Sequence, residues 1–523
     1  MRLLTSFVAT IVICSTALGS DLQLASLFTD GMVLQQGAPV RIWGTAAPLE
    51  KVHIEFAGQS HETHAAKDGS WMIVLKPLPI RRAPLQLTVD STGKKLVRKN
   101  ILVGEVWLAG GQSNMKTGMQ AYKQVTQSDM DASADSELRF ITIPKVGSRL
   151  EEEGVWFEAS PESVRTFSAT SYYFAKALRE QLDVPVGVIV CASGGSPAEA
   201  WMSRGTLQSH PGLNRIVEAF DGHCERAFQD RADYIRQLNA YTEASKEYRK
   251  RKKAALSEGS EPPPKPKEVM GWDYPKRPGG LYEEMLKKTI PYTVKGVIWY
   301  QGENNANANA GAQYRLVFSQ LIEQWRKDFN DPALPFYFVQ LPNLDRKNRE
   351  HRIAWTEVRD SQQWVADNVE NTGMAVLVDG GHRTNIHPPS KDKVGQRLSL
   401  LALKNVYGKS VRADAPRLIE GKPDGRAVVL RFNEPVELRA GDGDAFEVCG
   451  ADKVFFPAVA TTRGETIVVS SSNVTEPSFV RYGWDEWFTP VIYGETEIPV
   501  GPFRTDDFPL QTEGNYQYMK LDR

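Results

Sequence analysis

The sequence has little cysteine and no excess of charge of either sign. Its four cysteines are scattered, without the spacing of a metal site or of a disulfide framework. Sixty-three Lys and Arg residues face 64 Asp and Glu residues, for a net charge of −1. No overall field therefore attracts nucleic acid or an anionic membrane. We expect no metal and no nucleic-acid partner, and function must come from local sites.

The N-terminus carries an apolar run that is either a membrane anchor or a secretory signal peptide. Arg2 precedes the apolar stretch 3–14, and Ala17-Leu18-Gly19 follows with small-x-small spacing. A membrane anchor needs about 20 apolar residues, and this stretch is shorter and interrupted by Ser and Thr. Residues 1–19 therefore resemble a secretory signal peptide cut before Ser20. This predicts a secreted or periplasmic protein with no membrane span in the mature chain.

Removal of this leader takes Cys14 with it and leaves Cys191, Cys224 and Cys449, so at most one disulfide is possible. The rest of the composition is unremarkable: 523 residues, 41% hydrophobic and 24% charged. Such values exclude disorder, collagen and coiled coil. At roughly 100–200 residues per domain, the length predicts two to four domains.

The texture of the chain changes twice. Residues 20–103 show short alternating strands between Gly, Pro and Asp, which predicts a small antiparallel β-sandwich. Residues 104–409 alternate near-continuous apolar runs with helical segments, as in a three-layered α/β fold with a parallel sheet. A charged stretch and a proline run interrupt this pattern at about 224–290, and we interpret them as a solvated helix and a loop. Residues 410–523 return to strand texture and predict a second small β domain.

The parallel strands are predicted at 106–109, 186–190, 296–300, 335–341 and 374–378, and the helices at 168–182, 313–329 and 353–366.

The segment Gly104-Glu-Val-Trp-Leu-Ala-Gly-Gly-Gln-Ser-Asn-Met115 carries the strongest chemical signal. Its apolar strand ends in two glycines that allow a sharp turn, which presents Ser113 at the carboxyl end of a parallel strand, where open α/β sheets bind ligands. No G-x-S-x-G occurs, which argues against the usual α/β-hydrolase elbow. Ser113 is therefore a candidate nucleophile, and the alternative is an ordinary strand-end turn with a capping serine.

A nucleophilic serine needs a base, and His387 is the candidate. It follows the last long apolar run and precedes a helix, and Pro388 and Pro389 make its loop rigid. The alternative is a merely exposed loop histidine. The alkoxide formed in the reaction needs N–H donors, and two segments after strands, 190–196 and 299–306, lie where such donors are wanted.

Together and in this order, these segments resemble the sialate O-acetylesterase family of the SGNH hydrolase superfamily. The resemblance covers about residues 24–405. The matching stretches are 27–35, 40–44, 104–115, 167–174, 201–203, 279–282, 297–306, 325–326, 334–341 and 386–388 with Lys391. It implies an α/β three-layer SGNH-hydrolase (flavodoxin-like) catalytic domain between the two small β-sandwich domains. It also implies a serine esterase that removes acetyl groups from sugar hydroxyls without a metal or an organic cofactor.

By position, the resemblance makes Ser113 the nucleophile and His387 the base. The oxyanion and substrate-binding positions that it implies are Gly194, Gly195, Gln301, Glu303, Asn304 and Asn305. Which of the two asparagines is the donor stays open. Relatives often have Asp where this chain has Asn385, so we expect Asp379, after the last strand, to orient the histidine; a backbone carbonyl is the alternative.

These assignments predict two-step acyl transfer through an acetyl-serine, with a carbohydrate as the partner, most simply acetylated sialic acid. Two alternatives stay open: an acetylesterase of plant or algal polysaccharide, and a catalytically impaired carbohydrate-binding protein. The sequence does not fix the sugar, the acetyl position or the oligomeric state.

Overall fold

The computed structural model describes residues 21–144, 154–345, 352–441, 443–515 and Tyr518. The predicted signal peptide, with Cys14, lies outside the described residues. The remaining cysteines, Cys191, Cys224 and Cys449, are buried and free. Among the described residues, no helix is long and apolar enough to cross a membrane.

A large mixed sheet organises the fold. Its main path is β10 (Phe157–Ala159), β9 (Asp135–Thr142), β11 (Val186–Ala192), β8 (Lys94–Gly111), β12 (Gly296–Tyr300), β13 (Phe336–Val339) and β14 (Thr372–Ala375). From β9 to β14 all neighbours are parallel. After β8 the chain builds β9 and β11 on one side and then crosses to β12 on the other. The order thus reverses around β8, and in open α/β sheets ligands bind at the carboxyl ends of the strands at such a point.

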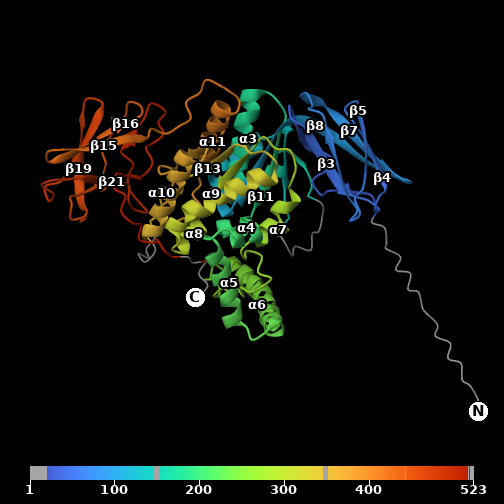
Figure 1. Ribbon diagram of the computed structural model, residues 1–523, viewed down its shortest axis with the longest axis horizontal. Helices are drawn as coiled ribbons and strands as arrows, with labels where there is room; N and C mark the ends of the chain where they lie inside the picture. Colours follow the sequence, from blue (N-terminus) through green and yellow to red (C-terminus); the bar gives the residue numbers. More distant parts are fainter. Residues whose placement is uncertain (1–20, 145–153, 346–351, 442, 516–517, 519–523) are drawn as a thin grey trace, which may run out of the picture.

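Helices cover both faces of this sheet (Figure 1). Trp107 and Ala109 of β8 belong to the core beneath α3 (Ala169–Leu182) and α11 (Lys391–Asn405). The intervening Leu108 belongs to the core beneath α9 (Gly311–Asp328) and α10 (Arg352–Asn368). Burial on both faces makes each strand a near-continuous apolar run. The predicted mixed α/β class is confirmed, and the three predicted helices match α3, α9 and α10 to within two residues.

The predicted boundary at 103/104 falls inside a single strand. The first part of β8 pairs antiparallel with β7 (Arg81–Ser91), whereas from Glu105 onward β8 pairs in parallel with β11 and β12. From Ile101 every residue of β8 is buried, which is why the sequence texture changes there. The other N-terminal strands are β1 (Gln23–Leu24), β2 (Val33–Gln35), β3 (Val40–Thr45), β4 (Lys51–Phe56), β5 (Gln59–His64) and β6 (Ser70–Leu75).

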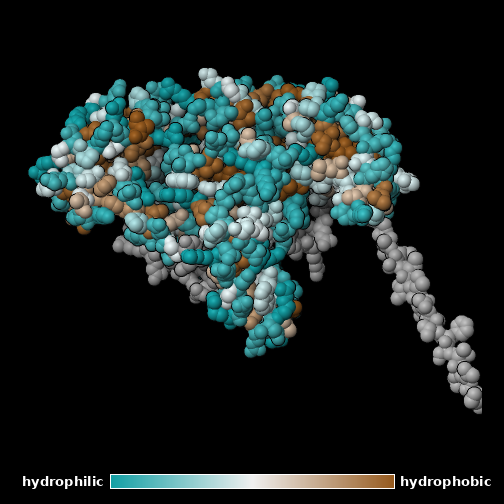
Figure 2. Space-filling model, in the orientation of Figure 1, coloured by the Kyte–Doolittle hydropathy of each residue, from teal (hydrophilic) through white to brown (hydrophobic). Residues whose placement is uncertain are grey.

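A helical insertion follows β11. It contains α4 (Arg204–Ser209), α5 (Asn214–Ala227), α6 (Arg231–Ser257) and α7 (Gly280–Glu284). Helices α5 and α6 protrude from the body of the molecule beyond α4, and their surface is mostly hydrophilic (Figures 1 and 2). The cationic run 249–253 lies exposed on α6, and the proline run 261–267 is neither helix nor strand. Both interpretations of these stretches are therefore confirmed.

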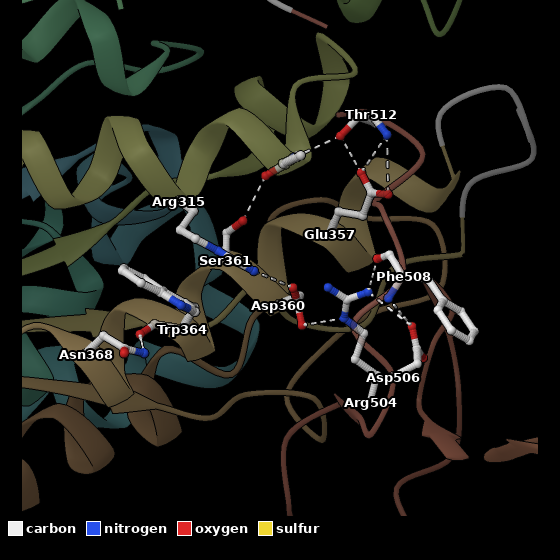
Figure 3. Close-up of polar contacts among 12 residues, drawn as sticks. Arg315, Glu357, Asp360, Ser361, Trp364, Asn368, Arg504, Asp506, Phe508 and Thr512 are labelled. Atoms are coloured by element: carbon white, nitrogen blue, oxygen red, sulfur yellow. Dashed lines mark hydrogen bonds and ion pairs between the residues drawn. The ribbon is translucent and has the colours of Figure 1, made fainter. Parts of the chain in front are cut away.

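The C-terminal part is a second sheet, as the strand texture predicts. Its order is β15 (Leu418–Asp424), β16 (Ala427–Phe432), β20 (Thr466–Ser470), β19 (Phe456–Arg463), β18 (Phe446–Cys449), β21 (Phe479–Tyr482) and β23 (Phe503–Arg504), with β17 (Glu437–Leu438) paired to β22 (Ile492–Tyr493). Two side chains of α10, a helix that covers the central sheet, contact the C-terminal part of the chain. Glu357 accepts hydrogen bonds from Thr512, and Asp360 forms an ion pair with Arg504 at 3.6 Å (Figure 3).

Candidate active site

The turn that presents Ser113 requires glycine. Gly111, the last residue of β8, has φ +131°, and a Cβ there would lie 2.2 Å from the carbonyl oxygen of Tyr300 on the neighbouring β12. Only glycine tolerates both this conformation and this approach. Directly after the turn, the short helix α1 (Ser113–Lys116) begins with Ser113. The glycine turn inferred from the sequence is thus present and places the serine at the carboxyl end of β8.

Ser113 meets the histidine that the sequence pairs with it. His387 Nε2 lies 2.7 Å from Ser113 Oγ, although 274 residues separate them in the chain. This is the hydrogen-bond reach expected of a nucleophile and its base. Burial, and secondly the nearby Lys391, lower the pKa of His387. The imidazole is therefore neutral at pH 7 and can accept the serine proton.

The backbone around His387 is held on both sides. Asn385 Oδ1 accepts a hydrogen bond of 2.9 Å from the His387 N–H. Asn114, next to the serine, donates from Nδ2 to the carbonyl oxygen of Ile386 at 3.0 Å. Asn114, which follows the nucleophile in sequence, is therefore hydrogen-bonded to Ile386, which precedes the base. Within the described residues, no carboxylate hydrogen-bonds to His387.

Asp379 does not take the place that the sequence predicts for it. Arg397 binds its two carboxylate oxygens at 2.6 and 2.7 Å, and Lys393 binds one of them at 2.8 Å. Burial alone would raise the pKa of Asp379, but these two cations outweigh it and lower the pKa. The carboxylate is thus committed to α11 and not to His387. Lys393 and Arg397 are four residues apart, so they share one face of that helix and bind the carboxylate together.

The glycine loop after β11 lies against the serine. A Cβ on Gly194 would be 3.6 Å from Ser113 Cβ, and Gly195 has φ +64°. Within the described part of the chain, the backbone N–H groups of Ser113, Gly194 and Gly195 donate no hydrogen bond. From the loop after β12, Asn304 donates from Nδ2 to the Gly195 carbonyl oxygen at 3.1 Å. The N–H groups of Ser113 and of the two glycines are therefore uncommitted donors close to Ser113, and Asn304 adjoins them through its bond to Gly195.

The two asparagines that the sequence could not separate have different surroundings. The buried Asn305 donates to both oxygens of Glu199 at 3.0 Å and accepts from Gln301 Nε2 at 2.8 Å. Its amide is therefore used inside the scaffold, as is that of Gln301, which also donates to the carbonyl of Ser196. Asn304 is the one beside the glycine loop. Successive residues of a helix point about 100° apart, and both belong to α8 (Glu303–Asn307).

Next to the serine lie two buried titratable residues, Lys391 and Glu303. The resemblance places Glu303 among the oxyanion and substrate-binding positions, whereas the sequence assigns no role to Lys391. Lys391 is fully buried and donates from Nζ to Asn114 Oδ1 at 2.5 Å, while Asn114 Nδ2 donates to Glu303 Oε1 at 2.6 Å. The Lys391 ammonium also lies 5.3 Å from the ring centres of Tyr122 and Tyr300. Burial lowers the pKa of Lys391 to about 7 and raises that of Glu303. The pair joins α1, α8 and α11 through one amide.

A parallel sheet carrying a hydrogen-bonded serine and histidine at its carboxyl edge has clear counterparts among known proteins. Residues 103–229 and 268–404 match the sequence model of a family described as carbohydrate esterase, sialic acid-specific acetylesterase. The protein is an esterase. More closely, the chain belongs to this sialic acid-specific acetylesterase family of carbohydrate esterases, which confirms the predicted resemblance.

Individual relatives agree. The sialate O-acetylesterase of Mus musculus is 26% identical over 540 residues, which cover 94% of this chain and 95% of the relative. That of Homo sapiens is 26% identical over 537 residues, or 93% and 92% of the two chains. Among solved structures, a carbohydrate acetylesterase from Xanthomonas citri is 31% identical, with a TM-score of 0.74 over 93% of this chain and 100% of that one.

Proposed function

We propose that this esterase removes O-acetyl groups from sugars through an acetyl-serine intermediate on Ser113, with acetylated sialic acid as the first substrate to test. The 2.7 Å contact between Ser113 Oγ and a neutral His387 carries the proposal. It also favours a working esterase over an impaired carbohydrate-binding protein, because the base is already in place. The mammalian relatives are sialate O-acetylesterases, which supports sialic acid as the substrate.

The chemistry follows from the contacts. His387 Nε2 takes the proton of Ser113 as Oγ bonds to the acetyl carbonyl carbon. The resulting oxyanion is stabilised by the N–H groups of Ser113, Gly194 and Gly195 and by the side-chain amide of Asn304. His387 then protonates the departing sugar oxygen, and a water molecule, deprotonated by His387, releases acetate from the serine. Backbone contacts, rather than Asp379, hold the histidine.

We also propose a domain arrangement and an export route for the chain. We infer that residues 104–409 form the three-layer flavodoxin-like domain of SGNH hydrolases, since helices cover both faces of the central sheet. Residues 20–103 and 410–523 would be its flanking β domains. The leader 1–19 would direct the chain to the periplasm or the outside of the cell.

The alternative substrate that the sequence leaves open is an acetylated plant or algal polysaccharide. The solved relative at 31% identity is described as a carbohydrate acetylesterase, with no sugar named, and this is compatible with either substrate. Acetate release from acetylated sialic acid and from acetylated xylan, measured side by side, distinguishes the two.

A fluorophosphonate label followed by peptide mapping tests the nucleophile. The chain contains its own control, because Ser60 also follows Gly-Gln and lies 2.9 Å from His53 Nε2, on the exposed strand β5. Ser60, however, lies within a β-strand of an antiparallel pair, whereas Ser113 begins a helix at the end of a parallel strand. We expect the label on Ser113 alone, no acetate release by Ser113→Ala, and full activity of Ser60→Ala. Labelling of Ser60, or activity of Ser113→Ala within about tenfold of wild type, would refute the mechanism.

A further inference from the structure

A pocket of about 490 Å³ lies between α6, residues 268–276 and the glycine loop. Its wall includes Ser193 of that loop, Tyr241 and Thr242 of α6, and Glu268 and Tyr274. This volume is in the range of sites that bind small molecules, about 300–1,000 Å³. None of the assigned roles uses it.

The pocket adjoins the candidate active site through the glycine loop. Gly194 faces Ser113, as described above, whereas a Cβ on the next residue, Gly195, would lie 3.4 Å from Nζ of Lys276 in the pocket wall. Because consecutive Cα atoms are about 3.8 Å apart, Ser113 Cβ and Lys276 Nζ are at most about 14 Å apart. This separation is short enough for neighbouring residues of one oligosaccharide to lie at the serine and in the pocket.

The chemistry of the wall suits a sugar ring. Tyr241 is half-buried and makes no hydrogen bond to any described residue, so its ring and hydroxyl can both serve a ligand. Tyr274 is fixed by donating its hydroxyl to Glu268 Oε2 at 2.8 Å. Burial alone would raise the pKa of Glu268, but the Tyr274 hydroxyl and nearby lysines lower it. The ionised carboxylate accepts hydrogen bonds from hydroxyl groups, and tyrosine rings cover apolar C–H faces.

The α6 side of the pocket comes from a segment outside the family match, which stops at residue 229 and resumes at 268. Tyr241 and Thr242 both belong to this unmatched segment, while Ser193 and the catalytic candidates belong to the matched core. Residues that match the family model therefore supply the candidate nucleophile and base. Helix α6, outside the match, supplies one wall of the adjoining pocket. This arrangement is expected of a specificity element.

We propose that this pocket binds a glycosyl residue adjacent to the acetylated sugar, so that the protein acts preferentially on acetylated oligosaccharides rather than on free acetylated monosaccharides. This inference rests on the proposed esterase function of Ser113. Tyr241 is then a specificity residue that contacts the neighbouring sugar without touching the reacting atoms.

The test compares kcat/KM of the full chain on four acetylated substrates and on 4-nitrophenyl acetate. The four are O-acetylated sialyllactose and acetylated xylotetraose, each paired with its free acetylated monosaccharide. We expect the wild type to prefer an oligosaccharide over its monosaccharide. Tyr241→Ala should remove about tenfold of that preference through KM and leave 4-nitrophenyl acetate hydrolysis unchanged. Tyr248→Ala, two turns further along α6 and outside the pocket wall, is the matched control and should match the wild type.

Thr242→Trp is a second test of the pocket. Thr242 is an exposed residue of the pocket wall, so a larger side chain there should fill the pocket, whereas Tyr241→Ala removes a contact from it. It should also weaken only oligosaccharide turnover. A wild type that hydrolyses 4-nitrophenyl acetate but shows no oligosaccharide preference overturns the pocket proposal, as do variants that keep the full preference. A wild type that does not hydrolyse 4-nitrophenyl acetate would instead overturn the proposed esterase function.

Discussion

Replacing Asp379 with Asn distinguishes a structural carboxylate from a catalytic one. Asn keeps the shape of the side chain but removes the charge that binds Arg397 and Lys393. The side chains of Asp379 and Arg397 are only 14% and 8% exposed, so solvent compensates little for the lost partner. Breaking such a buried pair costs about 3–5 kcal/mol. We expect the lower end, about 3 kcal/mol, because the Asn oxygen can still accept one hydrogen bond from Arg397.

This loss should appear as a lower melting temperature, because a destabilisation of 1 kcal/mol lowers Tm by roughly 2–4 °C in a domain of 150–250 residues and by less in a larger one. For Asp379→Asn, in the larger domain proposed at 104–409, a fall of at most about 6–12 °C is therefore expected. The lowered pKa of Asp379 gives the pH dependence its sign. The pair stabilises the wild type fully above the ordinary Asp pKa, and the stabilisation disappears as the pH falls through the lowered value. The difference in Tm between variant and wild type should narrow in acid.

Activity gives the other half of the test. Measured on 4-nitrophenyl acetate well below the melting temperature, kcat of Asp379→Asn should stay within about tenfold of wild type. A triad aspartate would instead cost about 10⁴ in kcat when changed to Asn. Asp345→Asn is the control, because Asp345 is half exposed in its ion pair with Arg383, and such pairs contribute at most about 1 kcal/mol. A loss of about 10⁴ in kcat of Asp379→Asn with an unchanged Tm would refute the structural role.

Three further predictions concern the rest of the site. Asn304→Ala should lower kcat by about 10²–10³ with little change in Tm. Asn305→Ala should instead lower Tm, because the buried Glu199 carboxylate loses both hydrogen bonds from Asn305 and keeps the one from Gln313; equal losses of kcat in both variants would contradict this division. The kcat/KM of the wild type should rise with pH to a plateau, with its midpoint below pH 6.5, because protonated His387 cannot accept the serine proton and its pKa is lowered; a midpoint above 7 would contradict the assignment. Lys391→Met should move that midpoint to higher pH, since the Lys391 charge helps to lower the pKa of His387; an unmoved midpoint in folded variant protein would show that the charge does not reach the histidine.

Local rules were enough to predict much of this protein. Strands buried on both faces must be apolar throughout, so β11 and β12 could be identified from their runs alone. The turn before Ser113 was predictable because two glycines end its apolar strand, and in the structure Gly111 has φ +131°, a conformation that favours glycine. His387 followed from its position after the last apolar run and before a helix. These features depend on neighbouring residues in the chain or on a backbone conformation, and a sequence displays both.

What only the tertiary structure decided is which partner each polar group takes. Asp379 lies near His387 in the sequence, but Lys393 and Arg397 reach it from one face of α11 and neutralise its charge. Lysine is usually exposed, but Lys391 is buried. Its Nζ donates a hydrogen bond to Asn114, which in turn donates one to Glu303. Buried polar groups take whichever partners the packing of distant segments brings within about 3 Å, and chain order does not record that competition.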